Sequence, residues 1–183
     1  MIRPARFSDV PAMYALLAEG FERSRYRTMG AIDQKVAKGL LVQAIQRDGQ
    51  PGEGGTLVRV ADQDGVVEGM IVAVLQRVYH IGDKLQATDL FYIGSPRCHP
   101  ADGRGLFDAM VAWADGNPRV VEILATVTDV LLDDWPRVGR LYERRGFVPC
   151  GGMWRRKTQA LVNAAASNRF VDVGAEADKC PAH

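Results

Sequence analysis

The feature that most constrains this chain is a long apolar run that directly follows a turn. Residues 66–78 consist mostly of Val, Ile, Leu, Met and Ala, and residues 56–60 form a shorter run of strand-forming residues before them. The sequence Asp62-Gln63-Asp64-Gly65 separates the two runs. Asp and Gly favour a reversal of the chain at such a position. The sequence therefore predicts a β-hairpin, and with it a fold built on a sheet.

Patterns on both sides of the hairpin predict further strands and helices. A first helix should begin at Ser8-Asp9-Val10-Pro11, where an N-cap residue precedes a proline. The stretch 21–26 is charged and aromatic, and it looks too irregular for a core helix. Further helices are predicted at residues 35–45, 106–114 and 140–145, and further strands at 2–5, 87–93, 120–127 and 147–155. The pattern is that of an α+β domain.

Length and charge limit the class of protein. With 183 residues and 47% apolar residues the chain is long enough for one domain with its own core. The formal net charge is +1, from 23 basic and 22 acidic residues, so no nucleic acid partner is expected. No apolar run reaches the roughly 20 residues of a membrane span, and the first residues lack the apolar core of a signal peptide. A cytoplasmic protein is expected.

The three cysteines do not form a recognisable framework. Cys98, Cys150 and Cys180 are an odd number with no metal-ligand spacing, and none of the three histidines stands in such a spacing either. We expect free thiols and no metal.

Residues 158–183 have no place in the predicted domain, which covers residues 1–157. They are small, polar and poorly patterned, and such a segment is rarely ordered by itself. We expect a C-terminal extension that is either a free tail or an assembly or docking arm, with a sister subunit of a homo-oligomer or a larger assembly as the partner of such an arm.

The segment Arg140-Leu141-Tyr142-Glu143-Arg144-Arg145-Gly146-Phe147 predicts a helix that ends at a glycine C-cap. It resembles a motif of the GNAT superfamily of N-acetyltransferases, and the element order agrees over about residues 1–157. The resemblance implies a mostly antiparallel mixed sheet flanked by helices, acetyl-CoA as cofactor, and a small-molecule or protein amine as acceptor. It also implies that Tyr142 protonates the departing thiolate. The alternative is that Tyr142 is an ordinary half-buried core tyrosine.

The same resemblance implies a loop that holds the pyrophosphate of coenzyme A at the start of the helix predicted at 106–114. The residues that would form this loop are Gly103, Arg104, Gly105 and Leu106. Amide groups at a helix start favour an anion, and small residues allow close approach. Asp102 and Phe107 depart from the family pattern, which has Arg or Gln and a small residue at these places, whereas Arg97 and Arg104 offer compensating charge. The alternative is a solvent-exposed turn.

The remaining site residues also follow from the resemblance. The pantetheine arm should lie against the end of the strand predicted at 87–93, at Ile93, Gly94 and Ser95. The acceptor should lie near Glu22, Tyr26 and Asp89, of which Asp89 and Glu22 are candidate bases.

A narrower resemblance links the chain to acetyltransferase-like proteins of tailed bacteriophages and prophages. It rests on Glu22-Arg23-Ser24-Arg25-Tyr26, Gly82-Asp83, the stretch 87–92, Ala112-Trp113-Ala114 and the stretch 140–147. This likeness implies a second hypothesis, in which a catalytically degenerate acetyltransferase fold serves as a structural component of a virion. The protein would then be found in the host cytoplasm or in the phage particle.

Overall fold

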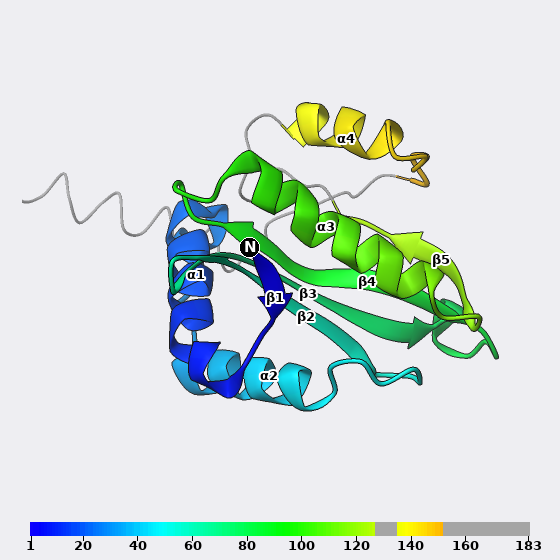
Figure 1. The fold of residues 1–183 in the computed structure, drawn as a ribbon, viewed down its shortest axis with the longest axis horizontal. Helices are drawn as coiled ribbons and strands as arrows, with labels where there is room; N and C mark the ends of the chain where they lie inside the picture. Colours follow the sequence, from blue (N-terminus) through cyan, green and yellow to red (C-terminus); the bar gives the residue numbers. More distant parts are fainter. Residues whose placement is uncertain (127–134, 152–183) are drawn as a thin grey trace, which may run out of the picture. The chain divides into compact units, whose positions relative to one another are not determined.

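The computed structural model describes residues 1–126 and 135–151 (Figure 1). The elements are, in chain order, β1 (Ile2–Pro4), η1 (Phe7–Asp9), α1 (Val10–Arg23), η2 (Arg25–Thr28), α2 (Gln34–Gln46), β2 (Thr56–Gln63), β3 (Val66–Arg77), η3 (Val78–His80), β4 (Leu85–Gly94), α3 (Pro100–Asp115), β5 (Val120–Leu124) and α4 (Trp135–Glu143). The chain divides into two compact units, Met1–Gly139 and Arg140–His183, and the first holds all of these strands together with α1, α2 and α3.

The described strands form one mixed sheet in the order β1-β2-β3-β4-β5. The pairings β1–β2, β2–β3 and β3–β4 are antiparallel, and β4–β5 is parallel. The hairpin predicted from the sequence is β2–β3, which closes at the pair Gln63 and Val66. Asp64 and Gly65 between them both have positive φ, as a tight hairpin turn requires. The predicted α+β class and mostly antiparallel sheet are confirmed.

Helices cover both faces of the sheet, which explains the long apolar run of β3. Met70 and Val72 are fully buried in one cluster with residues of α1 and α2. Leu75, on the other face of β3, packs in a second cluster with Ala114 of α3 and Leu85 of β4. Figure 1 shows α3 lying across the near face of the sheet. A strand buried on both faces needs apolar residues at successive positions, not only at alternate ones.

One predicted helix boundary is wrong by six residues. The sequence predicted a helix from residue 106, whereas α3 begins at Pro100 with His99 as its N-cap. The fixed φ of proline suits the first helical position, and its missing N–H costs nothing there. The glycines at 103 and 105 therefore lie inside the helix and not before it.

Three other predictions need smaller corrections. The stretch 21–26 is more regular than expected, because α1 continues to Arg23 and η2 begins at Arg25. The strand predicted at 147–155 is not seen in its described part, since residues 147–151 form no strand. The strand predicted at 120–127 is too long, because β5 ends at Leu124 and residues 125–126 form no strand. Residue 127, residues 152–155 and the predicted arm at 158–183 lie outside the described residues.

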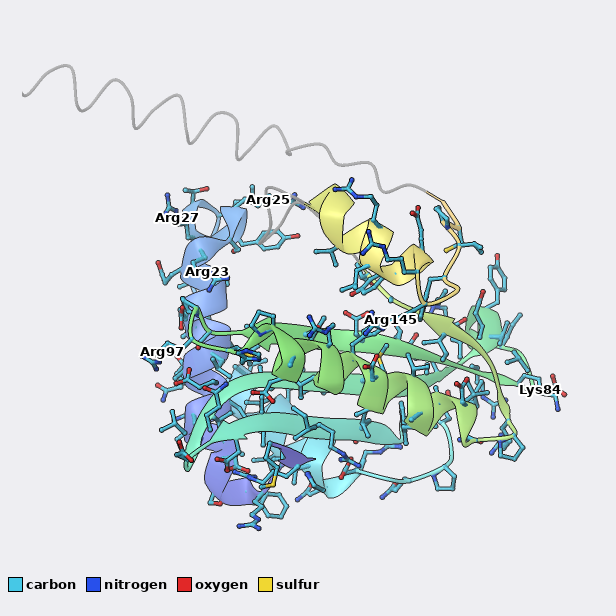
Figure 2. The ribbon with its side chains drawn as sticks, turned by 45° about the horizontal axis from the view of Figure 1, so that its top comes forward. Arg23, Arg25, Arg27, Lys84, Arg97 and Arg145 are labelled. Carbon is cyan, nitrogen blue, oxygen red and sulfur yellow. The ribbon has the colours of Figure 1, made fainter. Side chains whose placement is uncertain are left out.

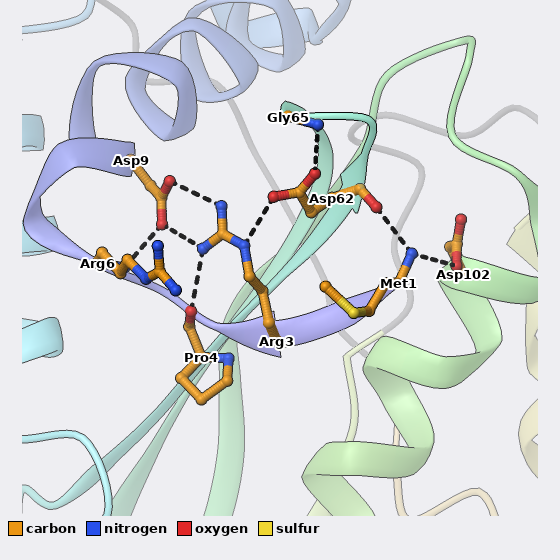
Figure 3. Close-up of polar contacts among 8 residues, drawn as sticks. All are labelled: Met1, Arg3, Pro4, Arg6, Asp9, Asp62, Gly65 and Asp102. Carbon is orange, nitrogen blue, oxygen red and sulfur yellow. Dashed lines mark hydrogen bonds and ion pairs between the residues drawn. The ribbon is translucent and has the colours of Figure 1, made fainter.

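A cluster of charged side chains ties β1 to the start of α1 and to the hairpin turn (Figure 3). Arg3 makes two contacts with the carboxylate of Asp9, at 2.7 and 3.0 Å, and its Nε donates to Asp62 at 2.7 Å. These bonds lower the pKa of both carboxyl groups and raise that of the guanidinium. The cluster holds the N-terminal strand at the edge of the sheet.

The described residues also bear on the cysteine and membrane predictions. Cys98 and Cys150 are free thiols, as predicted, and Cys180 lies outside the described residues. Of the helices described, none is both long and apolar enough to pass through a bilayer. No group of three His, Cys, Asp or Glu side chains that could hold a metal ion is found in residues 1–126 and 135–151.

Candidate functional site

The pairing of β4 is irregular towards its end. Its parallel pairing with β5 stops at Thr88 and Leu124, although β4 itself continues to Gly94. On the other side its register with β3 shifts, since Phe91 pairs with Val72 but Asp89 pairs with Ala73. Leu90 is therefore the extra residue of a β-bulge. Bulges bend a strand and re-aim side chains, and they are frequent beside active sites.

Asp89 holds the chain after β5 at the point where the two strands part. Its Oδ1 accepts a hydrogen bond from the backbone N–H of Thr126 at 2.9 Å. Burial raises the pKa of this carboxyl group above its usual value, although the hydrogen bonds that it accepts act in the opposite direction. Asp89, predicted as an acceptor-side residue, thus lies on the diverging strand with a pKa displaced towards neutrality.

Two paired glycines make room for the turn that follows β4. Gly94 is the register partner of Gly69 on β3. A Cβ at Gly69 would lie 2.9 Å from Sγ of Cys98, and a Cβ at Gly94 would lie 3.0 Å from Cβ of the same residue. The predicted pantetheine residues Ile93, Gly94 and Ser95 are thus at the end of β4 and in a tightly packed turn.

A buried carboxylate, which was not singled out from the sequence, supports this turn. Glu68 is only 5% exposed, and it accepts hydrogen bonds from the hydroxyl of Ser95 and, at 2.8 Å, from Nε of Arg97. These bonds, that of Arg97 above all, lower the pKa of Glu68. The Arg97 side chain itself is largely exposed (Figure 2). The sequence did contain a signal for this residue, because Glu68 is the single acid inside the apolar run of β3. A charge buried without a partner is costly, so a partner for it could have been expected.

The four residues predicted to hold pyrophosphate lie in α3, so the premise of a loop before the helix is wrong for them. The amide of Gly103 donates to the carbonyl of His99 at 3.1 Å, and its own carbonyl accepts from the hydroxyl of Tyr92 at 2.8 Å. Gly105 packs against β1, because a Cβ there would lie 3.1 Å from Cγ1 of Ile2. Leu106 is fully buried and Arg104 is exposed. The glycines serve the packing of the helix on the sheet.

Glu22 and Tyr26 lie near the end of α1, in a segment rich in arginine (Figure 2). Both side chains are exposed, and the guanidinium of Arg25 lies 5.2 Å from the centre of the Tyr26 ring. Helix α1 reaches β4, since a Cβ at Gly20 would lie 3.4 Å from Cδ1 of Ile93. The structure therefore brings the last turns of α1 next to the end of β4, with Glu22 in the helix itself.

Tyr142 belongs to the second compact unit, where it takes part in the C-cap of α4. The amide of Gly146 donates to the carbonyl of Glu143 at 3.0 Å, and that of Phe147 donates to the carbonyl of Tyr142 at 3.2 Å. Gly146 has a φ of 85°, and the rings of Tyr142 and Phe147 are 5.7 Å apart. This is a Schellman motif with its usual hydrophobic contact. The predicted glycine cap is confirmed, and Tyr142, at 7% exposure, is more buried than expected.

Comparison with known proteins identifies the fold. Neither a family model nor a curated protein matches the sequence. Among solved structures, an acetyltransferase from Trypanosoma brucei matches with a TM-score of 0.61 at 14% identity, over 86% of this chain and 99% of that chain. A ribosomal-protein-alanine N-acetyltransferase from Brucella melitensis biovar Abortus 2308 matches with a TM-score of 0.59 at 14% identity, over 86% and 98% of the two chains. A transcriptional regulator from Bacillus halodurans C-125 matches with a TM-score of 0.62 at 19% identity, over 86% and 99%.

These similarities define a class of fold, that of the GNAT acetyltransferases, which the sequence had predicted. The matched proteins carry different descriptions, and at such low identity a shared fold does not fix a shared activity. The function has to be inferred from the site.

Proposed function

We propose that this chain is an N-acyltransferase that transfers an acetyl group from acetyl-CoA to an amine of a small molecule or protein. The observation that carries the proposal is the end of β4. Over residues 89–94 the strand pairs with β3 on one side, and it has no strand partner on the other among the described residues. An extended chain with amide groups, such as pantetheine, can add to a strand of this kind through backbone hydrogen bonds.

The chemistry requires one bond to form, one to break and two proton movements. The amine nitrogen attacks the thioester carbonyl carbon, the C–N bond forms, and the C–S bond breaks as the thiolate leaves. Asp89 is the proposed base for the proton lost by the amine, because a raised pKa makes a carboxylate a better proton acceptor. Tyr142 is the proposed acid that protonates the thiolate, a role that rests on the resemblance.

A second function is favoured by a different observation. Most backbone amides of the turn between β4 and α3 already have partners within the chain, which is unusual for a site that binds phosphate. This supports the alternative hypothesis of a catalytically degenerate fold that acts as a structural component of a phage particle, with residues 158–183 as the docking arm.

Calorimetric titration with acetyl-CoA distinguishes the two functions. Saturable binding with a micromolar Kd is expected for the acyltransferase. Tyr142→Phe should bind equally well, because only a hydroxyl that acts late in the reaction is lost. Absence of binding at millimolar acetyl-CoA would reject the enzyme and leave the structural role.

A further inference from the structure

We propose that the acyl donor is recognised through its pantetheine arm and thioester, and that the 3′-phospho-ADP half of coenzyme A adds no affinity. This inference rests on the proposed function. It is based on the hydrogen-bond partners of the backbone amides in the segment between β4 and α3, because these amides are the donors that a diphosphate would need.

In the first half of this segment the amides are bonded within the chain. The amide of Ser95 donates to the carbonyl of Glu68 at 2.8 Å. Those of Arg97 and Cys98 donate to Oγ and O of Ser95, both at 3.0 Å. Residue 96 is a proline and has no N–H to offer.

Most amides in the second half of the segment are also bonded within the chain. His99 places Nδ1 3.1 Å from the amide of Ala101, and its carbonyl accepts from the amides of Asp102, at 2.9 Å, and Gly103, at 3.1 Å. Pro100 again has no N–H. Within the part of the chain that the structure describes, the amide of His99 is the one backbone N–H of residues 95–103 that is left for an anion.

Charge and shape do not compensate for the missing donors. The positive charge of Arg97 is offset by Glu68, which binds its Nε at 2.8 Å. Asp102 adds a carboxylate to the first turn of α3, with the N-terminal ammonium of Met1 3.7 Å from its Oδ1. The glycine that would allow close approach in a phosphate loop, Gly105, faces Ile2 instead. A diphosphate at this helix end would meet one backbone amide without a partner and the exposed guanidinium of Arg97, beside two acidic side chains.

The site thus fits the part of the donor that the β4 edge can pair with, and not the nucleotide. The donor that fits this site is a pantetheine thioester. Two kinds of molecule carry this group: a free thioester such as acetyl-CoA, and a carrier protein with acetyl-phosphopantetheine attached.

The test compares four probes by calorimetry on the full chain: acetyl-CoA, S-acetylpantetheine, adenosine 3′,5′-bisphosphate and an acetylated carrier protein. A hydrogen bond to a phosphate typically changes a binding constant by roughly tenfold or more. We expect acetyl-CoA and S-acetylpantetheine to bind with Kd values within about threefold of each other, and the bisphosphate not to compete with either. Tighter binding of the acetylated carrier would identify the carrier as the source, and equal or weaker binding would identify the free thioester.

The inference fails if acetyl-CoA binds more than about tenfold tighter than S-acetylpantetheine, or if the bisphosphate displaces it; the proposed acyltransferase would still stand. If no thioester binds, the proposed function itself fails and the inference falls with it. The two failures are therefore distinct.

A pair of histidine variants tests the assigned cause. His99→Ala removes the side chain that holds the Ala101 amide, so it should shift the preference towards acetyl-CoA over S-acetylpantetheine. His80→Ala, at an exposed histidine on η3, should leave the ratio of Kd values unchanged. Equal ratios in both variants would contradict the role given to His99.

Discussion

Replacing Gly69 by alanine should destabilise the protein, because the new methyl group would collide with the turn above β3. An ideal Cβ at Gly69 lies 2.9 Å from Sγ of Cys98 and 3.3 Å from Cδ1 of Leu106, whereas nonbonded carbon atoms prefer about 3.5 to 4.0 Å. Leu106 is fully buried, so its side chain has little room to move aside. Overpacking by one methyl costs about 1–3 kcal/mol, and the stiffer unfolded chain offsets about 0.4–1 kcal/mol. The difference spans about 0–2.6 kcal/mol, and a net loss of about 1.3 kcal/mol, its midpoint, is expected.

Chemical denaturation of three variants measures this loss. Gly69→Ala alone should lower the free energy of unfolding, and Tm should fall by roughly 2–4 °C per kcal/mol. In a Cys98→Ala background the same change should cost less, because the nearest atom is gone. Gly39→Ala, in α2 with no atom within 4 Å of its Cβ position, is the control and should stabilise. An unchanged stability of Gly69→Ala, or an equal loss in both backgrounds, would refute the packing described for this turn.

Variants at three other positions test the site and the charged cluster. Asp89→Asn keeps an oxygen that can accept the hydrogen bond from the Thr126 amide, so turnover should fall while Tm stays unchanged, whereas Asp89→Ala should lower both turnover and Tm. In the wild type, turnover should rise with pH through the raised pKa of Asp89. Tyr142→Phe should keep the ring contact in the helix cap and lower turnover only, and unchanged turnover would remove the hydroxyl from the mechanism. Arg3→Met should destabilise more than the exposed control Arg23→Met at neutral pH. Since Arg3 lowers the pKa of Asp9, this stabilisation is present above about pH 4 and is lost as the pH falls through the folded-state pKa of Asp9. The free energies of unfolding of the two variants, measured by urea denaturation, should therefore converge in acid.

The elements predicted well are those whose sequence pattern has a local cause. The β2–β3 hairpin was predicted because β3 is buried on both faces and its turn needs residues that accept a positive φ. The cap at Gly146 was predicted because a helix end that needs a residue with positive φ favours glycine, whatever the helix packs against.

The start of α3 was missed because two local signals conflicted. Gly103 and Gly105 are poor helix formers, and they resemble a phosphate loop when taken alone. Packing of Gly105 on Ile2 and the bond from Tyr92 to Gly103 place them inside the helix instead. Pro100 after His99 was the signal that could have located the helix start.

Two features of β4 could not be predicted for a different reason: the bulge at Leu90 and the contact between Asp89 and Thr126. Both depend on how β4 aligns with β3 and β5, which are distant in the sequence. A single sequence shows which residues favour a strand, but the register between strands is set by the whole sheet.

Hydrogen exchange along β4, with and without S-acetylpantetheine, tests the central claim most directly. If the donor adds to the edge of β4 that has no strand partner among the described residues, ligand should slow the exchange of amides within residues 89–94 and leave those of residues 101–106 in α3 unchanged. Protection in α3 with none in β4 would contradict the proposed binding edge.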